Sequence, residues 1–153
     1  MNKEYNGSAH LENIITGTNY RFTILTPRLI RLEYNPEGIF EDRPTTLIVN
    51  RKTEKVEYKK KEDKKYLEIS TPYFRLTYQK GTPFYSGKFD TMKNLKVELL
   101  NTDGIWYYGH PEVRNYGAPS TSLDDSKGKM KLKKGLYSVD GFASIKDESD
   151  IIL

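Results

Sequence analysis

The segment from Trp106 to Asp125, followed by Gly135–Phe142, contains the residue types that suit sugar recognition. Aromatic rings stack on the apolar C–H faces of a pyranose, and charged or amide groups hydrogen-bond to its hydroxyl rim. The available rings are Trp106, Tyr107, Tyr108 and Tyr116, and the polar groups include Arg114. We expect the substrate-binding residues to be Asp124, Asn115 and Asp125. If residues 105–108 form a strand, Trp106 belongs instead to the hydrophobic core.

Glycoside hydrolysis requires two carboxyl groups facing one glycosidic bond. They stand roughly 5–5.5 Å apart in retaining enzymes and roughly 6.5–9.5 Å apart in inverting ones. The candidate carboxylates are the pair Asp124 and Asp125 and the group Asp147, Glu148 and Asp150. Neighbouring side chains on a strand point to opposite faces, so Asp124 and Asp125 could converge only in a loop. The sequence therefore predicts no catalytic residue in this chain.

Other kinds of chemistry have little support. The chain has no cysteine, which excludes disulfides and thiolate zinc sites, and its two histidines, His10 and His110, lie far apart in the sequence. It contains no Gly-x-Ser-x-Gly, P-loop or Gly-x-Gly-x-x-Gly motif. A calcium site at Asp124 and Asp125 is conceivable but lacks the spacing of known calcium loops. We expect neither a cofactor nor a metal.

Charge and hydropathy suggest a domain without a nucleic-acid or membrane partner. The net charge of +4 comes from 25 basic and 21 acidic residues, with lysine runs at 59–65 and 127–134. Glu62 and Asp63 interrupt the first run, which therefore resembles a solvated hairpin turn. No apolar run is long enough to cross a membrane, and no apolar leader is visible at the start. We expect a cytoplasmic location.

Alternating apolar and polar residues predict short strands along most of the chain. Such runs occupy residues 20–25, 28–34, 45–49, 73–78, 95–99 and 105–108, and a hairpin is expected around the lysine-rich turn at 59–65. Turn residues separate them at short intervals, and no long helical stripe occurs. About nine short strands predict an all-β fold, an antiparallel β-sandwich. We expect a single domain over residues 1–153, with residues 1–10 frayed.

The last residues allow two interpretations. Ile151, Ile152 and Leu153 are apolar, and an unprotected run of this kind at a chain end would expose a strand edge. Either the chain is cut inside or just after the sandwich, or these residues form a final strand docked in the core.

Four segments in register resemble glycoside hydrolase family 31, the α-glucosidase and α-xylosidase family. The first segment is the opening of its N-terminal module, which residues 21–34 (Arg-Phe-Thr-Ile-Leu-Thr-Pro-Arg-Leu-Ile-Arg-Leu-Glu-Tyr) together with residues 40–45 (Phe-Glu-Asp-Arg-Pro-Thr) resemble. Residues 115–124 resemble the family's Asn-Leu-Gly-Gly-Thr-x-Arg-Thr-Leu-Asp. Residues 135–143 resemble Gly-Leu-Leu-Ser-Arg-Asp-Gly-Trp-Ala, and residues 147–149 resemble Asp-Asp-Ser. Order and spacing agree from about residue 20 to residue 150.

The resemblance implies a β-sandwich similar to galactose mutarotase, which in the family precedes a (β/α)8 barrel. The barrel carries both catalytic aspartates, so by resemblance this chain lacks them. A loop of the family's sandwich reaches the barrel mouth, and its aspartate contacts the sugar; the matching residue here is Asp124. The partners so implied are the barrel and, through the whole enzyme, an α-glucoside. The surface that meets the barrel would be exposed in the isolated chain, which favours a homo-oligomer.

Two other functions remain open on the sequence. The chain could be a free-standing carbohydrate-binding or mutarotase-like domain, although a mutarotase commonly pairs a histidine with a glutamate and only His110 is available in this segment. It could also be a purely structural module in which Asp124 only caps a turn.

Overall fold

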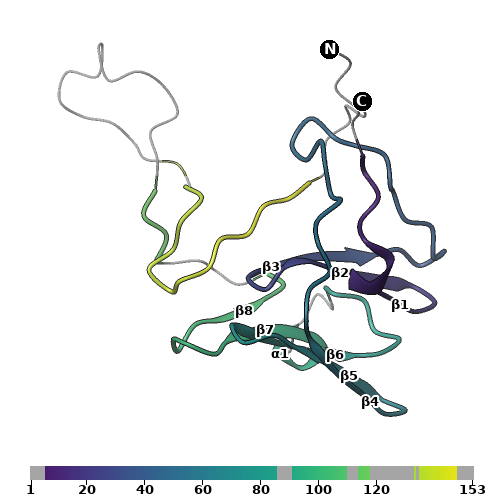
Figure 1. Ribbon diagram of the computed structural model, residues 1–153. Helices are drawn as coiled ribbons and strands as arrows, with labels where there is room; N and C mark the ends of the chain where they lie inside the picture. Colours follow the sequence, from purple (N-terminus) through teal and green to yellow (C-terminus); the bar gives the residue numbers. More distant parts are fainter. Residues whose placement is uncertain (1–5, 86–90, 110–113, 118–132, 134, 148–153) are drawn as a thin grey trace, which may run out of the picture.

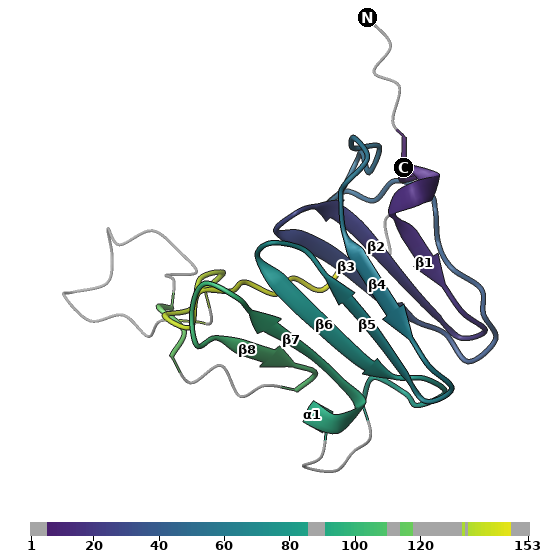
Figure 2. The ribbon, with the colours of Figure 1, turned by 60° about the horizontal axis from the view of Figure 1, so that its bottom comes forward.

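The protein is built from two antiparallel β-sheets packed face to face. The computed structural model describes residues 6–85, 91–109, 114–117, 133 and 135–147. The smaller sheet has three strands in the order β1-β2-β3, and the larger has five in the order β4-β5-β6-β7-β8. Figure 1 shows the two layers, and Figure 2 shows how the strands of each sheet lie side by side. The predicted all-β fold of antiparallel sheets is confirmed, with eight strands in the described residues.

Each sheet is a simple meander, in which every strand pairs with the next one along the chain. The small sheet contains β1 (Ile14–Thr16), β2 (Tyr20–Thr26) and β3 (Leu29–Tyr34). The large sheet contains β4 (Lys59–Glu62), β5 (Tyr66–Ser70), β6 (Phe74–Gln79), β7 (Leu95–Leu99) and β8 (Ile105–Tyr107). A 3-10 turn, η1 (Leu11–Asn13), precedes β1, and a single helical turn, α1 (Thr91–Asn94), precedes β7.

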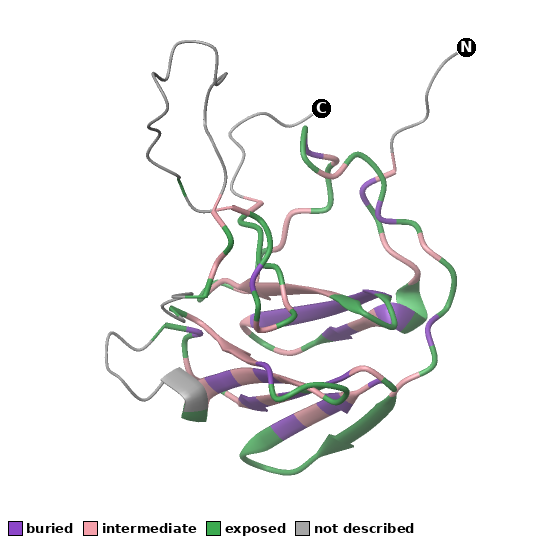
Figure 3. Ribbon diagram, turned by 90° about the vertical axis from the view of Figure 1, so that its left-hand side faces the viewer, coloured by how far each residue is buried: buried purple, intermediate pink, exposed green. Residues whose placement is uncertain are grey.

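The core lies between the sheets, on the faces that the sequence alternation predicts. Ile69, Leu76, Tyr78 and Leu95 are fully inaccessible to solvent in the large sheet, and Phe22 matches them in the small sheet. Figure 3 shows the buried residues gathered where the two layers face each other. Because period-2 alternation places every second side chain on one face of a strand, the sequence predicted these inward positions correctly.

Aromatic rings join the two layers. The ring of Phe22 in β2 stacks on Phe84 at 5.7 Å and meets the edge of Tyr78 in β6 at 5.4 Å between centroids. Tyr20 meets Tyr78 at 4.9 Å. At one end of the sandwich, the Thr71 hydroxyl donates to the Pro27 carbonyl at 2.7 Å. The sheets are therefore held together by edge-to-face and stacked contacts and by at least one direct hydrogen bond.

The lysine-rich turn forms a hairpin, as the sequence predicts. β4 pairs with β5 from Lys59 opposite Ser70 to Glu62 opposite Leu67. The Asp63 carboxylate closes the turn because it accepts from the amides of Lys65 and Tyr66, both at 2.7 Å. These bonds lower the pKa of Asp63, the amide of Tyr66 having the larger effect. The lysines of β4 are exposed at the edge of the sheet, where such charges oppose edge-to-edge pairing.

The strand predicted at residues 45–49 is wrong. This segment turns, with the Thr45 amide bonded to the Ile48 carbonyl at 3.1 Å and the Ile48 amide bonded to the Thr45 hydroxyl at 3.0 Å. Leu47 and Val49 are exposed, and so do not belong to a core strand. The β-branched residues that indicated a strand lie in the long connection between β3 and β4. The short strand β1 is an element for which the alternation gave no prediction.

The outer face of the small sheet is covered by this connection and carries buried charges. Arg21 is 7% exposed and forms ion pairs with Glu33 and Asp42, both at 2.7 Å. Burial opposes the charge of Arg21, but the bonds from Glu33 and Asp42 outweigh it and raise the pKa of the guanidinium. Burial lowers the pKa of the neighbouring Arg31. β2 is thus buried on both faces, with an apolar face inside and a charged one outside.

The beginning of the described chain is part of this cover. Asn6 forms a parallel bridge with Asn50, and Gly7 is so close to the connection that a β-carbon there would clash with the Asp42 carbonyl. Residues 6 and 7, which the sequence places in a frayed start, are therefore packed. In the part of the chain that the structure describes, no helix is long and apolar enough to span a bilayer.

Candidate functional site

Two segments of the candidate sugar-binding region pair to form a short ribbon. Residues 114–117 and 135–140, here called the Asn115 ribbon, meet at an antiparallel bridge between Asn115 and Ser138. The Tyr116 amide donates to the Tyr137 carbonyl, and the Val139 amide donates to the Arg114 carbonyl, both at 3.0 Å. Figure 1 shows the two segments side by side at the left of the molecule. Asp124 and Asp125 lie between them in the sequence, outside the described residues.

The Asn115 side chain fastens this ribbon. Its carbonyl oxygen accepts from the amides of Gly117 at 2.9 Å and Gly135 at 2.7 Å, and its amide group donates to the Gly135 carbonyl at 2.9 Å. An asparagine has two acceptor lone pairs and two N–H donors, so these bonds leave one donor for another partner. Asn115 therefore holds the two segments in register and has little capacity left for a sugar.

The sequence reasoning missed two polar residues of the ribbon, Ser138 and Asp140. The Ser138 hydroxyl donates to the Asp140 carboxylate at 3.1 Å and accepts from the Asp140 amide at 3.0 Å. The other carboxylate oxygen of Asp140 pairs with Arg114 at 2.9 Å. A Ser-x-Asp sequence before a glycine is a common turn signal, and it could have identified this contact.

The aromatic candidates divide between the core and the surface. Trp106 lies in β8 opposite Val97 and packs against the core, so the core interpretation of this residue is confirmed. Tyr108 also packs there. Tyr116 and Tyr137 are joined across the Asn115 ribbon by a backbone hydrogen bond, and each is 68% exposed. Their exposure makes both rings accessible for stacking on a ligand.

Of the remaining candidate carboxylates, Asp147 is the one that the structure describes. Glu148 and Asp150, like His110, lie outside the described residues. Asp147 lies at the connection between β3 and β4, where it bonds Thr45 and Arg51. Within the described ranges no group of three or more His, Cys, Asp or Glu side chains is arranged to hold a metal ion.

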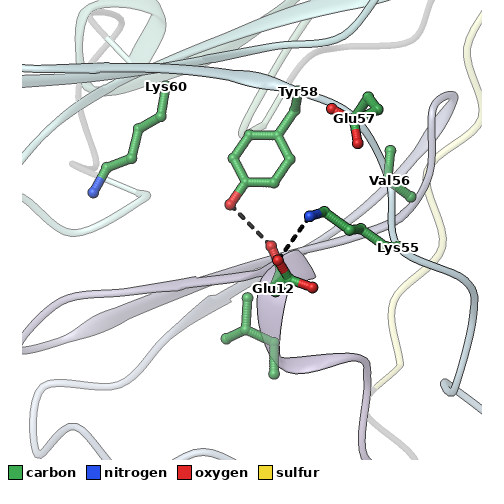
Figure 4. A pocket seen from close by; sticks show the side chains of 7 residues that line it. Glu12, Lys55, Val56, Glu57, Tyr58 and Lys60 are labelled. Carbon is green, nitrogen blue, oxygen red and sulfur yellow. Dashed lines mark hydrogen bonds and ion pairs between the residues drawn. The ribbon is translucent and has the colours of Figure 1, made fainter.

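An open groove of about 470 Å³ lies between η1 and β1 on one side and residues 55–60 on the other (Figure 4). The Lys55 ammonium pairs with the Glu12 carboxylate at 2.7 Å, and the Tyr58 hydroxyl donates to the Glu12 carbonyl at 3.0 Å. The hydrogen bond from Lys55 lowers the pKa of Glu12. Lys60 pairs with Glu62. These contacts occupy the charged groups of Glu12, Lys55 and Lys60, and we therefore interpret the groove as an edge of the sandwich and not as a binding site.

Comparison with models of known protein families and with curated proteins finds no match for this chain. The functional argument therefore depends on the residues of the chain and on their arrangement.

Proposed function

We propose that this chain is the non-catalytic N-terminal β-sandwich module of an enzyme of glycoside hydrolase family 31. In this proposal the sandwich is of the galactose-mutarotase type and packs on a (β/α)8 barrel that carries the catalytic residues. The module lends the barrel a loop that completes the pocket for an α-glucoside. The resemblance of four segments in register to the family suggests this assignment.

The observation that carries the proposal is the Asn115 ribbon. A loop that supplies one residue to a site on another domain has to leave its own domain from a fixed base. Asn115 provides three hydrogen bonds at the base of the segment that contains Asp124 and Asp125. In this function Asp124 and Asp125 contact the sugar, and Asn115 acts chiefly by positioning them.

The proposal predicts that the isolated chain is inactive and that the parent enzyme depends on Asp124. The 153-residue protein should not hydrolyse nitrophenyl α-glucoside above the rate in buffer, because a retaining or inverting site needs two carboxyl groups across the bond. In the parent enzyme, Asp124→Ala should lower kcat/KM by a factor that corresponds to about 1.5–3 kcal/mol of lost transition-state stabilisation, the contribution of a charge-assisted hydrogen bond. Steady-state kinetics of both proteins measure these effects.

Glu37→Ala is the matched control, since it removes an exposed carboxylate from the turn after β3. It should leave kcat/KM unchanged. Hydrolysis by the isolated chain would contradict the accessory role. An Asp124→Ala enzyme with normal kcat/KM would show instead that the module is purely structural.

A free-standing carbohydrate-binding domain is the second candidate, and the exposed pair Tyr116 and Tyr137 favours it. Two exposed rings on one ribbon can stack on a pyranose without help from another domain. Titration of the isolated chain with glucose, maltose and isomaltose by NMR separates the two functions. Saturable binding with a Kd below about 1 mM would favour the second function, since this Kd corresponds to a binding free energy of more than about 4 kcal/mol in the absence of a barrel.

A further inference from the structure

Asp147 joins the end of the described chain to the outer face of the small sheet. One of its carboxylate oxygens accepts from the Thr45 hydroxyl at 2.8 Å, and the other accepts from the Arg51 guanidinium at 3.1 Å. Thr45 and Arg51 are 102 and 96 residues away in the sequence. Figure 1 shows the yellow segment crossing from the Asn115 ribbon to the connection between β3 and β4.

The buried charge of Arg51 depends on Asp147. Its side chain is wholly buried, and its other hydrogen bonds reach the carbonyls of Gly7 and Arg43. Its Nε has no hydrogen-bond partner among the described residues. The ion pair with Asp147 therefore supplies the counter-charge of a buried cation, and a buried cation that loses its counter-charge is strongly disfavoured.

The segment 141–147, here called the strap, has a close contact at each end. At the near end, a β-carbon at Gly104 would clash with the Asp140 carbonyl, so the ribbon and the turn before β8 are in close contact. At the far end stands Asp147. No strand or helix is formed along the strap, and most of its residues are exposed.

The Asn115 ribbon needs such anchors. A two-stranded ribbon is marginally stable in water by itself. Among the described residues this one has one bridge, two flanking backbone bonds and the side-chain bonds of Asn115. Its Asp140 end packs against Gly104, in the turn before β8. Its position relative to the sandwich therefore depends on the contacts that hold its ends.

We propose that Asp147 is a latch: by binding Arg51 and Thr45 it holds the strap on the connection that covers the small sheet, and thereby helps to keep the Asn115 ribbon in position. The latch couples the outer face of the small sheet to the base of the candidate loop. The inference goes beyond the proposed function and does not rest on it, because the latch needs neither a sugar nor a catalytic barrel.

Native-state hydrogen exchange of the 153-residue protein tests the latch. Asp147→Asn removes the counter-charge of Arg51 while it keeps the shape of the side chain. The amides of Tyr116 and Val139, which bond across the ribbon, should exchange at least about tenfold faster, because the ribbon loses one anchor. The amides of β5, β6 and β7 report whether the sandwich itself stays intact.

Thr45→Val is the milder variant and keeps the test decisive if Asp147→Asn does not fold. It removes the hydroxyl that Asp147 accepts from, and it leaves the Arg51 ion pair. It should accelerate the same two ribbon amides by a smaller factor than Asp147→Asn. The Ile48 amide, which bonds the Thr45 hydroxyl, serves as a local reporter.

Asp42→Asn is the matched control, because it removes a carboxylate that pairs with a buried arginine of the same face but does not belong to the strap. It should leave the Tyr116 and Val139 amides unchanged. Exchange that rises only near Ile48 and Arg51 in the Thr45→Val protein, with the ribbon amides unaffected, would overturn the latch. Equal acceleration of the ribbon by Asp42→Asn would overturn it as well.

Discussion

Tyr78 shows how one residue of the core combines burial with a hydrogen bond. Its ring lies between Tyr20, Phe22 and Phe84, and its hydroxyl donates to the Thr82 carbonyl at 2.6 Å. Burial raises the pKa of Tyr78 to about 12, from an ordinary value of 10.0. The neutral phenol is therefore the form that the folded protein stabilises.

We expect Tyr78→Phe to reduce stability at pH 7 and to flatten its loss in alkali. The missing hydrogen bond should cost about 1 kcal/mol. A phenol with a raised pKa contributes stability that is complete below pH 10.0 and is lost as pH rises toward about 12. Urea unfolding from pH 7 to pH 12 should show a shallower decline in Tyr78→Phe than in the wild type.

Tyr66→Phe is the control for this prediction, since Tyr66 lies at the sheet surface and is 36% exposed. Its unfolding free energy should follow the wild-type pH profile. An identical alkaline decline in Tyr78→Phe and the wild type would show that Tyr78 does not titrate in this range.

At the scale of the element, the contact between the Asn115 ribbon and the turn before β8 depends on Gly104. Gly104 is buried, and a β-carbon there would clash with the Asp140 carbonyl and lie 2.8 Å from the Leu99 side chain. The first of these obstacles is backbone, which cannot rotate away. The ribbon or the turn would have to move as a unit.

We therefore expect Gly104→Ala to destabilise the protein by about 1–3 kcal/mol, the usual cost of overpacking. Thermal unfolding measures the loss, and chemical-shift changes should concentrate at residues 99–104 and 135–141. Asp103→Ala, at the exposed neighbouring position, should change stability by less than about 0.5 kcal/mol. If Gly104→Ala were as stable as Asp103→Ala, the close contact would not exist in solution.

At the scale of the whole molecule, the two sheets share one core. Phe22 of the small sheet contacts Tyr78 of the large sheet and Phe84 in the turn after β6. Because neither sheet can bury its apolar face alone, the two should fold as one cooperative unit.

Phe22→Ala should lower the free energy of unfolding by about 3–5 kcal/mol, the usual effect of truncating a buried ring. Tyrosine fluorescence and far-UV circular dichroism should still give coincident urea transitions, because the sheets unfold together. Leu29→Ala, which truncates a side chain 52% exposed, should have an effect below about 1 kcal/mol. Separate transitions for the two probes would show that the sheets are independent units.

The sequence predicted the strands with the strongest alternation and missed those elements that depend on distant partners. β5, β6 and β7 follow a period of two, and Asp63 closes the hairpin with amides two and three residues ahead. The β-branched residues of the segment 45–49 favour a strand locally, which is why the sequence predicts a strand where the structure has a turn. In the folded chain the Thr45 hydroxyl instead donates to the carboxylate of Asp147, a partner 102 residues away.

The candidate site divides in the same way. The residue types of sugar recognition are visible in the sequence, and so is the place of Trp106 in a strand. Only the tertiary structure shows that Asn115 uses most of its hydrogen-bonding capacity on the ribbon and that Asp147 binds the connection between β3 and β4.

By itself, then, the sequence determined the all-β class, the inward faces of the strands and the lysine-rich hairpin, because side-chain alternation and turn chemistry act over a few residues. Only the tertiary structure decided which charges are buried and what each polar candidate binds. Arg51 is a charged residue of the kind usually exposed, yet its side chain is wholly buried. The burial is possible because its hydrogen bonds and ion pair are made by Gly7, Arg43 and Asp147. No local pattern can bring those three groups together.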